Sequence, residues 1–153
     1  MTGTALAPEE ILALLPQQEP FRFVDEIREI SKRHIVARYT FPPDLEFYRG
    51  HFPGNPVTPG VILLECIAQV GVVALGIYLV ALEGGLEAVD SRLSLFADAD
   101  VDFSGVVRPG DRVTVSAKKK FFRRGKLRSE AEMRLDDGTL VCSATISGIA
   151  VPR

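Results

Sequence analysis

The sequence has no tryptophan and contains two cysteines, two methionines and two histidines among its 153 residues. Cys66 and Cys142 match no zinc-binding or redox spacing, and both stand among apolar residues. This setting favours buried free thiols in a reducing compartment, so we expect a cytoplasmic protein with no metal site. Because histidine is so scarce, the surroundings of each histidine are informative.

The chain also lacks an excess of one charge, since 18 basic residues face 20 acidic ones and the net charge is -2. This balance gives no reason to expect nucleic acid or an anionic membrane as a partner. Apolar residues (46%) and charged residues (25%) have ordinary proportions, and the length fits one domain over residues 1–153. The N-terminal segment has no positively charged region before its short apolar run, so no secretory signal is predicted.

One long apolar run, Val57–Leu82, raises the question of a membrane span. It contains Glu65 and Gln69, begins with a Pro-Gly pair, and has no Lys or Arg anchors at either end. A soluble helix buried on every side explains the same composition. We therefore predict a core helix over Pro59–Leu82 that ends at Gly84-Gly85, and no membrane span.

Residues with period-two alternation flank this helix and predict an antiparallel sheet. One long apolar helix beside several strands indicates the α+β class, with a curved sheet wrapped around the helix. A second copy of the sheet would complete the helix's cover, so the pattern predicts a hot-dog fold and a dimer. The other predicted elements are a short helix at Pro8–Leu15, a strand at Ile27–Phe41, short extended pieces around 96–103, and strands around 113–117, 127–135 and 140–146.

The stretch "GHFPGNPVTPGVILLECIAQ" places His51 on a loop rich in proline and glycine, just before the apolar helix. Such a loop holds one shape at little entropic cost, and the amides of Gly60 and Val61 lie free at the helix start. Glu65 follows in apolar surroundings that should raise its pKa. A base, an oxyanion site and a proton donor are together typical of β-elimination of water from a 3-hydroxyacyl thioester. Taken singly, a loop histidine or an embedded glutamate is more often structural, and the residues alone leave both readings open.

Three segments in order, "PFRFVDEI", the stretch above and "FADADVDFSGVVRPGD", resemble the 3-hydroxyacyl-acyl-carrier-protein dehydratases of type II fatty-acid synthesis. The resemblance spans roughly residues 14–151. It implies that His51 and Glu65 are the catalytic pair, that Gly60 supplies the oxyanion amide and that Gln69 supports the acid. It also implies an acyl-carrier-protein-bound substrate, no cofactor, and an obligatory homodimer in which His51 of one subunit faces Glu65 of the other. The family includes trimers of dimers.

Two details refine the resemblance. A glutamate at position 65 resembles the branch of the family that dehydrates without moving the double bond, whose isomerising relatives carry aspartate. The family's basic run before its Pro-Gly-Asp reads Asp102-Phe103-Ser104-Gly105 here, so carrier-binding charge is missing at that place.

A second basic segment could replace that charge. "KKKFFRRGKLR" is either a docking patch for an acidic carrier or for coenzyme A phosphates, or a solvated hairpin whose lysines protect a sheet edge. The candidate docking residues are Lys118, Lys119, Lys120, Arg123, Arg124 and Lys126.

Two rival functions remain open from the sequence. In an acyl-thioester hydrolase with the same fold, Glu65 would activate water and the products would include a free thiol. A non-catalytic acyl-binding subunit would keep the fold and turn over no thioester. The sequence sets no acyl chain length.

Overall fold

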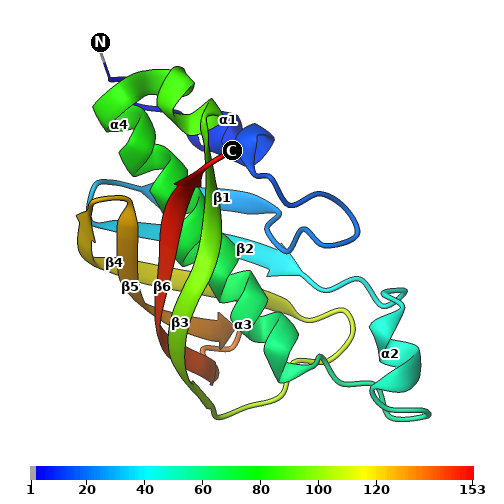
Figure 1. Ribbon diagram of the computed structural model, residues 1–153. Coiled ribbons are helices and arrows are strands. Elements are labelled where there is room, and N and C mark those ends of the chain that lie inside the picture. Colours follow the sequence, from blue (N-terminus) through cyan, green and yellow to red (C-terminus); the bar gives the residue numbers. More distant parts are fainter. Residues whose placement is uncertain (1–2) are drawn as a thin grey trace.

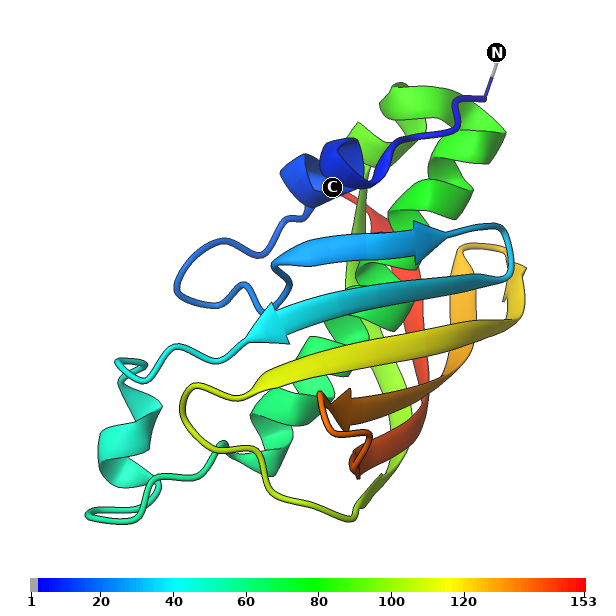
Figure 2. The same cartoon turned by 180° about the vertical axis from the view of Figure 1, so that it is seen from behind.

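A six-stranded antiparallel sheet curves around one long central helix in the computed structural model, which describes residues 3–153 (Figure 1; Figure 2). The strand order across the sheet is β1-β2-β4-β5-β6-β3. The strands are β1 Glu26–Ile30, β2 His34–Thr40, β3 Arg92–Phe103, β4 Arg112–Arg123, β5 Lys126–Leu135 and β6 Leu140–Pro152. This arrangement confirms the predicted hot-dog fold.

The central helix is continuous but irregular. It comprises α3 Gly60–Ala68, a π-helical segment η1 Gln69–Ala74, and α4 Leu75–Asp90. Its predicted end at Gly84-Gly85 is wrong in part, because Gly85 adopts a left-handed φ of 69° and kinks the chain, which then continues helically to Asp90. Two shorter helices are α1 Pro8–Leu14 and α2 Phe47–Gly50.

The apolar composition of the central helix follows from its place in the core. Over Gly60–Asp90 it is long and apolar enough to cross a membrane, yet 61% of its most apolar stretch is buried within the molecule. The sheet approaches the helix closely at Gly71, where an added Cβ would lie 3.1 Å from the Cβ of Ala117. Core burial therefore accounts for this run of apolar residues.

The strand predicted over Ile27–Phe41 is wrong as a single element, because the chain turns back between β1 and β2. The hydroxyl of Ser31 accepts hydrogen bonds from the backbone amides of Arg33 and His34, at 3.1 and 3.3 Å, and stabilises the reversal. Ile27 then pairs with Ala37 across an antiparallel ladder.

The strands β4 and β5 form a hairpin with a two-residue turn. Arg124 and Gly125 both have positive φ, 52° and 75°, which is the signature of a type I′ turn. Glycine adopts this conformation freely, whereas arginine does so at a cost.

Strand β3 forms one edge of the sheet. The extended pieces predicted around residues 96–103 belong to this single strand of 12 residues, which pairs with β6 alone among the described residues 3–153. Most of its side chains are exposed, including three large apolar ones: Leu95, Phe96 and Phe103. A long edge strand that exposes large apolar side chains normally requires a cover.

Candidate functional site

His51 lies at the C-terminal end of α2, and its ring is held by the loop that follows. Its Nδ1 lies 2.9 Å from the carbonyl oxygen of Val57, and the Val57 amide donates back to the His51 carbonyl at 2.9 Å. Since a carbonyl only accepts, Nδ1 carries a proton, and in the neutral imidazole the lone pair is then on Nε2. The ring of Phe52 stacks on the imidazole with centroids 4.1 Å apart.

The loop carrying His51 is fastened to the rest of the molecule one residue beyond Val57. The backbone amide of Thr58 donates to the carbonyl of Val107 at 2.8 Å. The hydroxyls of Thr58 and Tyr48 are 2.6 Å apart, and both residues are buried. The rigidity that the prolines and glycines predict is thus reinforced by two anchoring hydrogen bonds.

Glu65 is half-buried on α3 and is held by Gln69 one turn further on. Burial raises the pKa of Glu65 above its ordinary value, and the hydrogen bond from Gln69 lowers it in part. The amide nitrogen of Gln69 donates to Glu65 Oε2 at 2.9 Å, which leaves Oε1 to carry a proton. The environment therefore favours a protonated carboxyl compared with an exposed glutamate.

The completely buried Gln69 has only one possible orientation. Its Oε1 accepts the backbone N–H of Phe23 at 2.7 Å, and its nitrogen donates to the carbonyl of Phe21 at 2.9 Å. Because a backbone amide can only donate, the nitrogen of Gln69 must face Glu65. The family resemblance implied that Gln69 supports the acid. It did not predict the hydrogen bonds from Gln69 to the backbone of Phe21 and Phe23, although both residues belong to the "PFRFVDEI" motif.

The N-terminus of α3 presents two free amides. The carbonyl of Pro59 accepts the amides of Ile62 and Leu63, whereas those of Gly60 and Val61 have no hydrogen-bond partner in the described part of the chain. An added Cβ on Gly60 would lie 3.1 Å from the ring of Phe103, so glycine allows close approach here. This end of the helix favours a negative charge.

A cavity of about 110 Å³ lies beside Glu65, between the central helix and strands β3 and β6. Its lining residues are Gln17, Glu65, Ala68, Val72, Val73, Ser94, Leu95, Phe96, Ile146 and Ser147. His51 and Gly60 do not line it, and α2 stands away from the sheet (Figure 1). One chain therefore does not bring the predicted catalytic pair together at this cavity. Sequence reasoning missed Gln17, which no motif marked.

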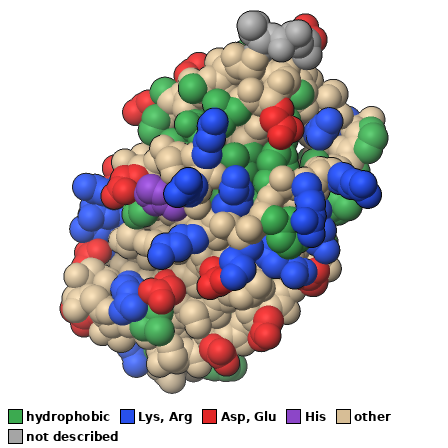
Figure 3. Space-filling view, turned by 90° about the vertical axis from the view of Figure 1, so that its left-hand side faces the viewer, with side chains coloured by type: hydrophobic (Ala, Val, Ile, Leu, Met, Phe, Trp, Pro, Cys, Tyr) green, Lys and Arg blue, Asp and Glu red, His purple; other side chains and the backbone are tan. Residues whose placement is uncertain are grey.

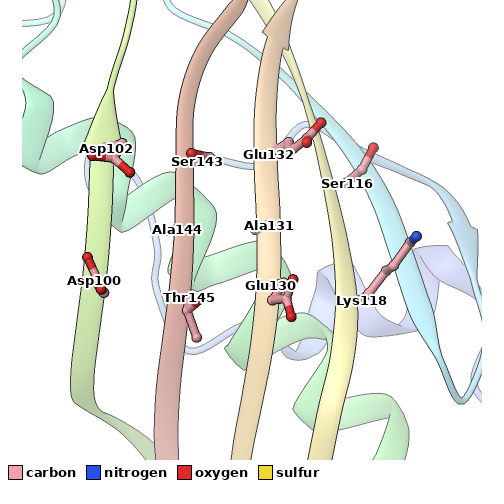
Figure 4. A pocket seen from close by; sticks show the side chains of 10 residues that line it. All are labelled: Asp100, Asp102, Ser116, Lys118, Glu130, Ala131, Glu132, Ser143, Ala144 and Thr145. Atoms are coloured by element: carbon pink, nitrogen blue, oxygen red, sulfur yellow. The ribbon is translucent and has the colours of Figure 1, made fainter.

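A broader hollow of about 440 Å³ lies on the outer face of the sheet (Figure 4). Four carboxylates contribute to it, from Asp100 and Asp102 on β3 and from Glu130 and Glu132 on β5, together with Lys118. It lies on the side of the sheet away from the central helix, so it is separate from the cavity at Glu65.

The basic residues of the β4–β5 hairpin gather on one side of the molecule (Figure 3). Lys120 and Lys126 pair with Glu130 and Asp98 respectively. Arg123 stacks over the ring of Phe121, with its guanidinium carbon 4.7 Å from the ring centre. Lys118, Lys119, Arg123 and Arg124 form no ion pair within the described residues, so much of the basic charge faces solvent.

Comparisons with known proteins identify the family of this chain. The FabA-like domain family matches residues 15–145. A 3-hydroxyacyl-[acyl-carrier-protein] dehydratase FabZ from Chloroflexus aggregans is 37% identical over 143 residues, which cover 92% of this chain and 93% of the relative. The enzyme of the same name from Klebsiella pneumoniae is 38% identical over 140 residues, covering 90% and 88%.

Solved structures show the same fold at low identity. A chain of the dehydratase heterocomplex ApeI:P from Xenorhabdus doucetiae aligns with a TM-score of 0.71 at 14% identity, covering 97% of this chain and 93% of that one. A thioesterase from Haemophilus influenzae aligns with a TM-score of 0.68 at 15% identity, covering 99% and 96%. Because both a dehydratase and a thioesterase share this fold, the solved structures do not identify the family. The sequence relatives at 37% and 38% identity do. The chain belongs to the FabA-like family of 3-hydroxyacyl-[acyl-carrier-protein] dehydratases.

Proposed function

We propose that this protein removes water from a 3-hydroxyacyl thioester on an acyl carrier protein and forms the trans-2-enoyl thioester. The observation that carries this proposal is a histidine with a free Nε2 and a half-buried carboxyl with a raised pKa, both on the family's motif. We place the reaction in the cytoplasm, in fatty-acid or related acyl-chain synthesis. The thioester itself acidifies C2, so the reaction uses no metal or redox cofactor.

In the proposed mechanism His51 acts as the base. Its Nε2 takes the proton from C2, and the carbonyl of Val57 stabilises the imidazolium that forms, through Nδ1–H. The amides of Gly60 and Val61 stabilise the negative charge on the thioester oxygen. Fixing the tautomer of His51 in advance means that no rearrangement is needed when the proton moves.

Glu65 acts as the acid. Its Oε1 gives a proton to the C3 hydroxyl, the C3–O bond breaks, and water leaves as the C2–C3 double bond forms. The hydrogen bond from Gln69 to Oε2 stabilises the carboxylate that results. Return of a proton from His51 to Glu65, through solvent, restores the site.

We further propose that each site is shared by two subunits. Within one chain His51 does not line the cavity at Glu65, so in this proposal the base comes from a second copy. Pairing of two β3 edges about a two-fold axis would cover exposed apolar side chains of that strand, of the neighbouring loops and of the start of α3. Those side chains are Phe52, Val61, Leu95, Phe96, Phe103 and Val106.

The β4–β5 hairpin is proposed as the docking surface for the acidic carrier. Lys118, Lys119, Arg123 and Arg124 keep their charge free of intramolecular ion pairs among the described residues. Long-range attraction of this kind raises the association rate and weakens with added salt. The basic hairpin would thus replace the positive charge that the family usually carries at the positions occupied here by Asp102 and Ser104.

The test is hydration of a crotonyl thioester, followed as loss of enoyl absorbance, by wild type, His51→Ala and Glu65→Gln. Carrier-protein and coenzyme A forms are compared side by side, and free thiol is measured in parallel. Each substitution should lower the rate about 100-fold or more, as is usual for loss of a general acid or base. Release of thiol without hydration would instead indicate a hydrolase, and an inert wild type would contradict the proposal.

A further inference from the structure

We infer that Gln17 binds the C3 hydroxyl of the substrate, and then the water that leaves, through its side-chain oxygen Oε1. The inference rests on the proposed function, in which Glu65 protonates that hydroxyl. It makes Gln17 a substrate-binding residue that distinguishes a 3-hydroxyacyl thioester from an acyl thioester without the hydroxyl.

The side-chain oxygen of Gln17 is buried and lacks a hydrogen-bond partner within residues 3–153. In this part of the chain, Nε of Arg38 on β2 is the only other buried side-chain nitrogen or oxygen without one. Buried polar atoms are nearly always paired, because an unpaired one has lost its hydrogen bonds to water. Since Gln17 lines the cavity at Glu65, its unpaired oxygen indicates a ligand that supplies the missing donor.

Gln17 and Glu65 line the same cavity, but no hydrogen bond joins Oε1 of Gln17 to the carboxyl group. The cavity volume of about 110 Å³ exceeds what one water molecule needs, so a hydroxyl group or a water fits beside both side chains. Oε1 of Glu65 is also free for a ligand, because Oε2 accepts the hydrogen bond from Gln69. The protonated carboxyl therefore offers a donor, and Gln17 an acceptor, to the same space.

The other polar groups on the cavity wall are two serines, Ser94 and Ser147. The Ser147 hydroxyl already accepts a hydrogen bond from Nε of Arg128 at 2.8 Å. Oγ of Ser94 packs toward Gly148, where an added Cβ would lie 3.2 Å away, and it is not a buried atom without a partner. Gln17 is therefore the lining residue whose buried oxygen a ligand has to satisfy.

The segment between α1 and β1 holds Gln17 in place. The side-chain amide of the adjacent Gln18 donates to the carbonyl of Leu15 at 3.0 Å, and the amide of Phe21 donates to the carbonyl of Gln18 at 2.7 Å. Gln69, which also binds the acid, donates to the carbonyl of Phe21 at 2.9 Å. One continuous set of hydrogen bonds thus fixes this segment relative to the acid.

A hydroxyl group matches both sides of the cavity, because it has one hydrogen to donate and two lone pairs that accept. In the dehydration the C3 hydroxyl donates to Oε1 of Gln17, and one of its lone pairs takes the proton of Glu65. The C3–O bond breaks with its electrons on oxygen. His51 takes the proton from C2, and the electrons of that C–H bond form the double bond. The water donates one hydrogen to Gln17 and the other to the Glu65 carboxylate.

An amide is better suited to this place than a second acid. The amide of Gln17 is neutral, so its oxygen accepts a hydrogen bond without competing for the proton of Glu65 and without placing a like charge beside it. An acyl thioester that lacks the hydroxyl leaves this oxygen unpaired. Sites built to bind a hydroxyl group discriminate against such analogues for this reason.

The first experiment measures binding without turnover, by isothermal titration of 3-hydroxybutanoyl and butanoyl coenzyme A into His51→Ala, with and without Gln17→Met. Methionine has the length of glutamine and lacks its amide oxygen. The hydroxy ligand should bind about tenfold more weakly after Gln17→Met, which is the effect of one hydrogen bond. Butanoyl coenzyme A should bind no more weakly. Gln18→Met, the matched control, alters the same segment outside the cavity and should leave the ratio of the two affinities unchanged.

The second experiment measures kcat/KM for hydration of crotonyl coenzyme A and the urea midpoint of unfolding. Gln17→Met should lower kcat/KM about tenfold. Its urea midpoint should be no lower than that of wild type, because the substitution removes a buried oxygen without a partner. Gln17→Leu replaces Gln17→Met in both experiments if that variant does not fold.

The inference is overturned if Gln17→Met weakens both ligands equally, if it leaves the affinity for the hydroxy ligand unchanged, or if His51→Ala does not bind that ligand. An unchanged kcat/KM in Gln17→Met would also overturn it. Failure of the proposed function looks different, because wild type would then hydrate no thioester. The comparison of the two ligands would still decide the role of Gln17.

Discussion

At the scale of single residues, Glu65 is a site where function and stability conflict. Its pKa is raised in the folded protein, mainly by burial, so its protonated form stabilises the fold relative to the unfolded chain. This contribution is complete below the pKa of the unfolded chain and is lost as the pH rises through the folded pKa. Glu65→Gln removes the dependence, because the amide remains neutral and can still accept the hydrogen bond from Gln69.

We therefore predict that Glu65→Gln is inactive yet more stable than wild type at neutral and alkaline pH. The advantage should disappear when the pH falls below the pKa of the unfolded glutamate, where both proteins are neutral at position 65. Urea unfolding across this pH range, at one fixed protein concentration, measures the difference. An advantage of equal size at every pH would show that titration of Glu65 is not its cause.

The hydrogen bonds of Gln69 lead to a second prediction at this scale. Gln69→Leu leaves the amide of Phe23 without its buried partner, which should cost about 1–3 kcal/mol of unfolding free energy. It also removes the hydrogen bond that lowers the pKa of Glu65. In the proposed dehydration Glu65 acts in its protonated form, so the alkaline fall of kcat/KM for dehydration of a 3-hydroxyacyl thioester should move to higher pH. A pH–rate profile that stays in place would contradict the assigned role.

At the scale of elements, the π-helical segment η1 receives one buried side-chain hydrogen bond from the sheet. The buried hydroxyl of Ser129 on β5 donates to the carbonyl of Gly71 at 2.7 Å. Ser129→Ala should destabilise the protein by about 1–3 kcal/mol, because that carbonyl is then buried without a partner. Ser116→Ala, on the exposed face of β4, is a control that should change the unfolding free energy little.

The β4–β5 turn allows docking and stability to be separated. Arg124 has a φ of 52°, which asparagine tolerates better than arginine. Arg124→Asn should raise the unfolding free energy by about 0.5–1 kcal/mol and raise KM for the carrier-linked substrate at low salt. The higher unfolding free energy would come from the relieved turn conformation. The higher KM would come from the loss of the positive charge. An unchanged KM at every salt concentration would count against the hairpin as docking surface.

Sequence reasoning recovered the elements that depend on local pattern and missed those that depend on contacts. The apolar run and the Pro-Gly start were enough to predict the central helix up to Gly84, whereas the pairing of His51 with Glu65 came from the family resemblance and stays a prediction. The reversal at Ser31 was missed, because a polar turn within an alternating pattern looks like continuous strand. The π-helical turn after Gln69 is stabilised by a residue 58 positions away in sequence from its acceptor, which no local window can detect.

At the scale of the whole molecule, the exposed edge of β3 and the separation of His51 from the cavity at Glu65 lead to the same conclusion. A lone chain leaves a 12-residue edge strand uncovered, with Leu95, Phe96 and Phe103 exposed, and keeps the proposed base away from the cavity at the proposed acid. The proposed two-fold dimer would join the edges and complete two equivalent sites, each with the histidine of one subunit and the glutamate of the other. Stability and catalysis would then both depend on association.

The most direct test of this shared site mixes two inactive variants. His51→Ala and Glu65→Gln are unfolded together in equal amounts, refolded, and assayed for hydration of a crotonyl thioester. Random pairing makes half of the dimers mixed, each with one intact site, so about a quarter of the wild-type activity should return. Activity no higher than that of either variant refolded alone, in a sample that size-exclusion chromatography and mass spectrometry show to contain mixed dimers, would contradict the shared site.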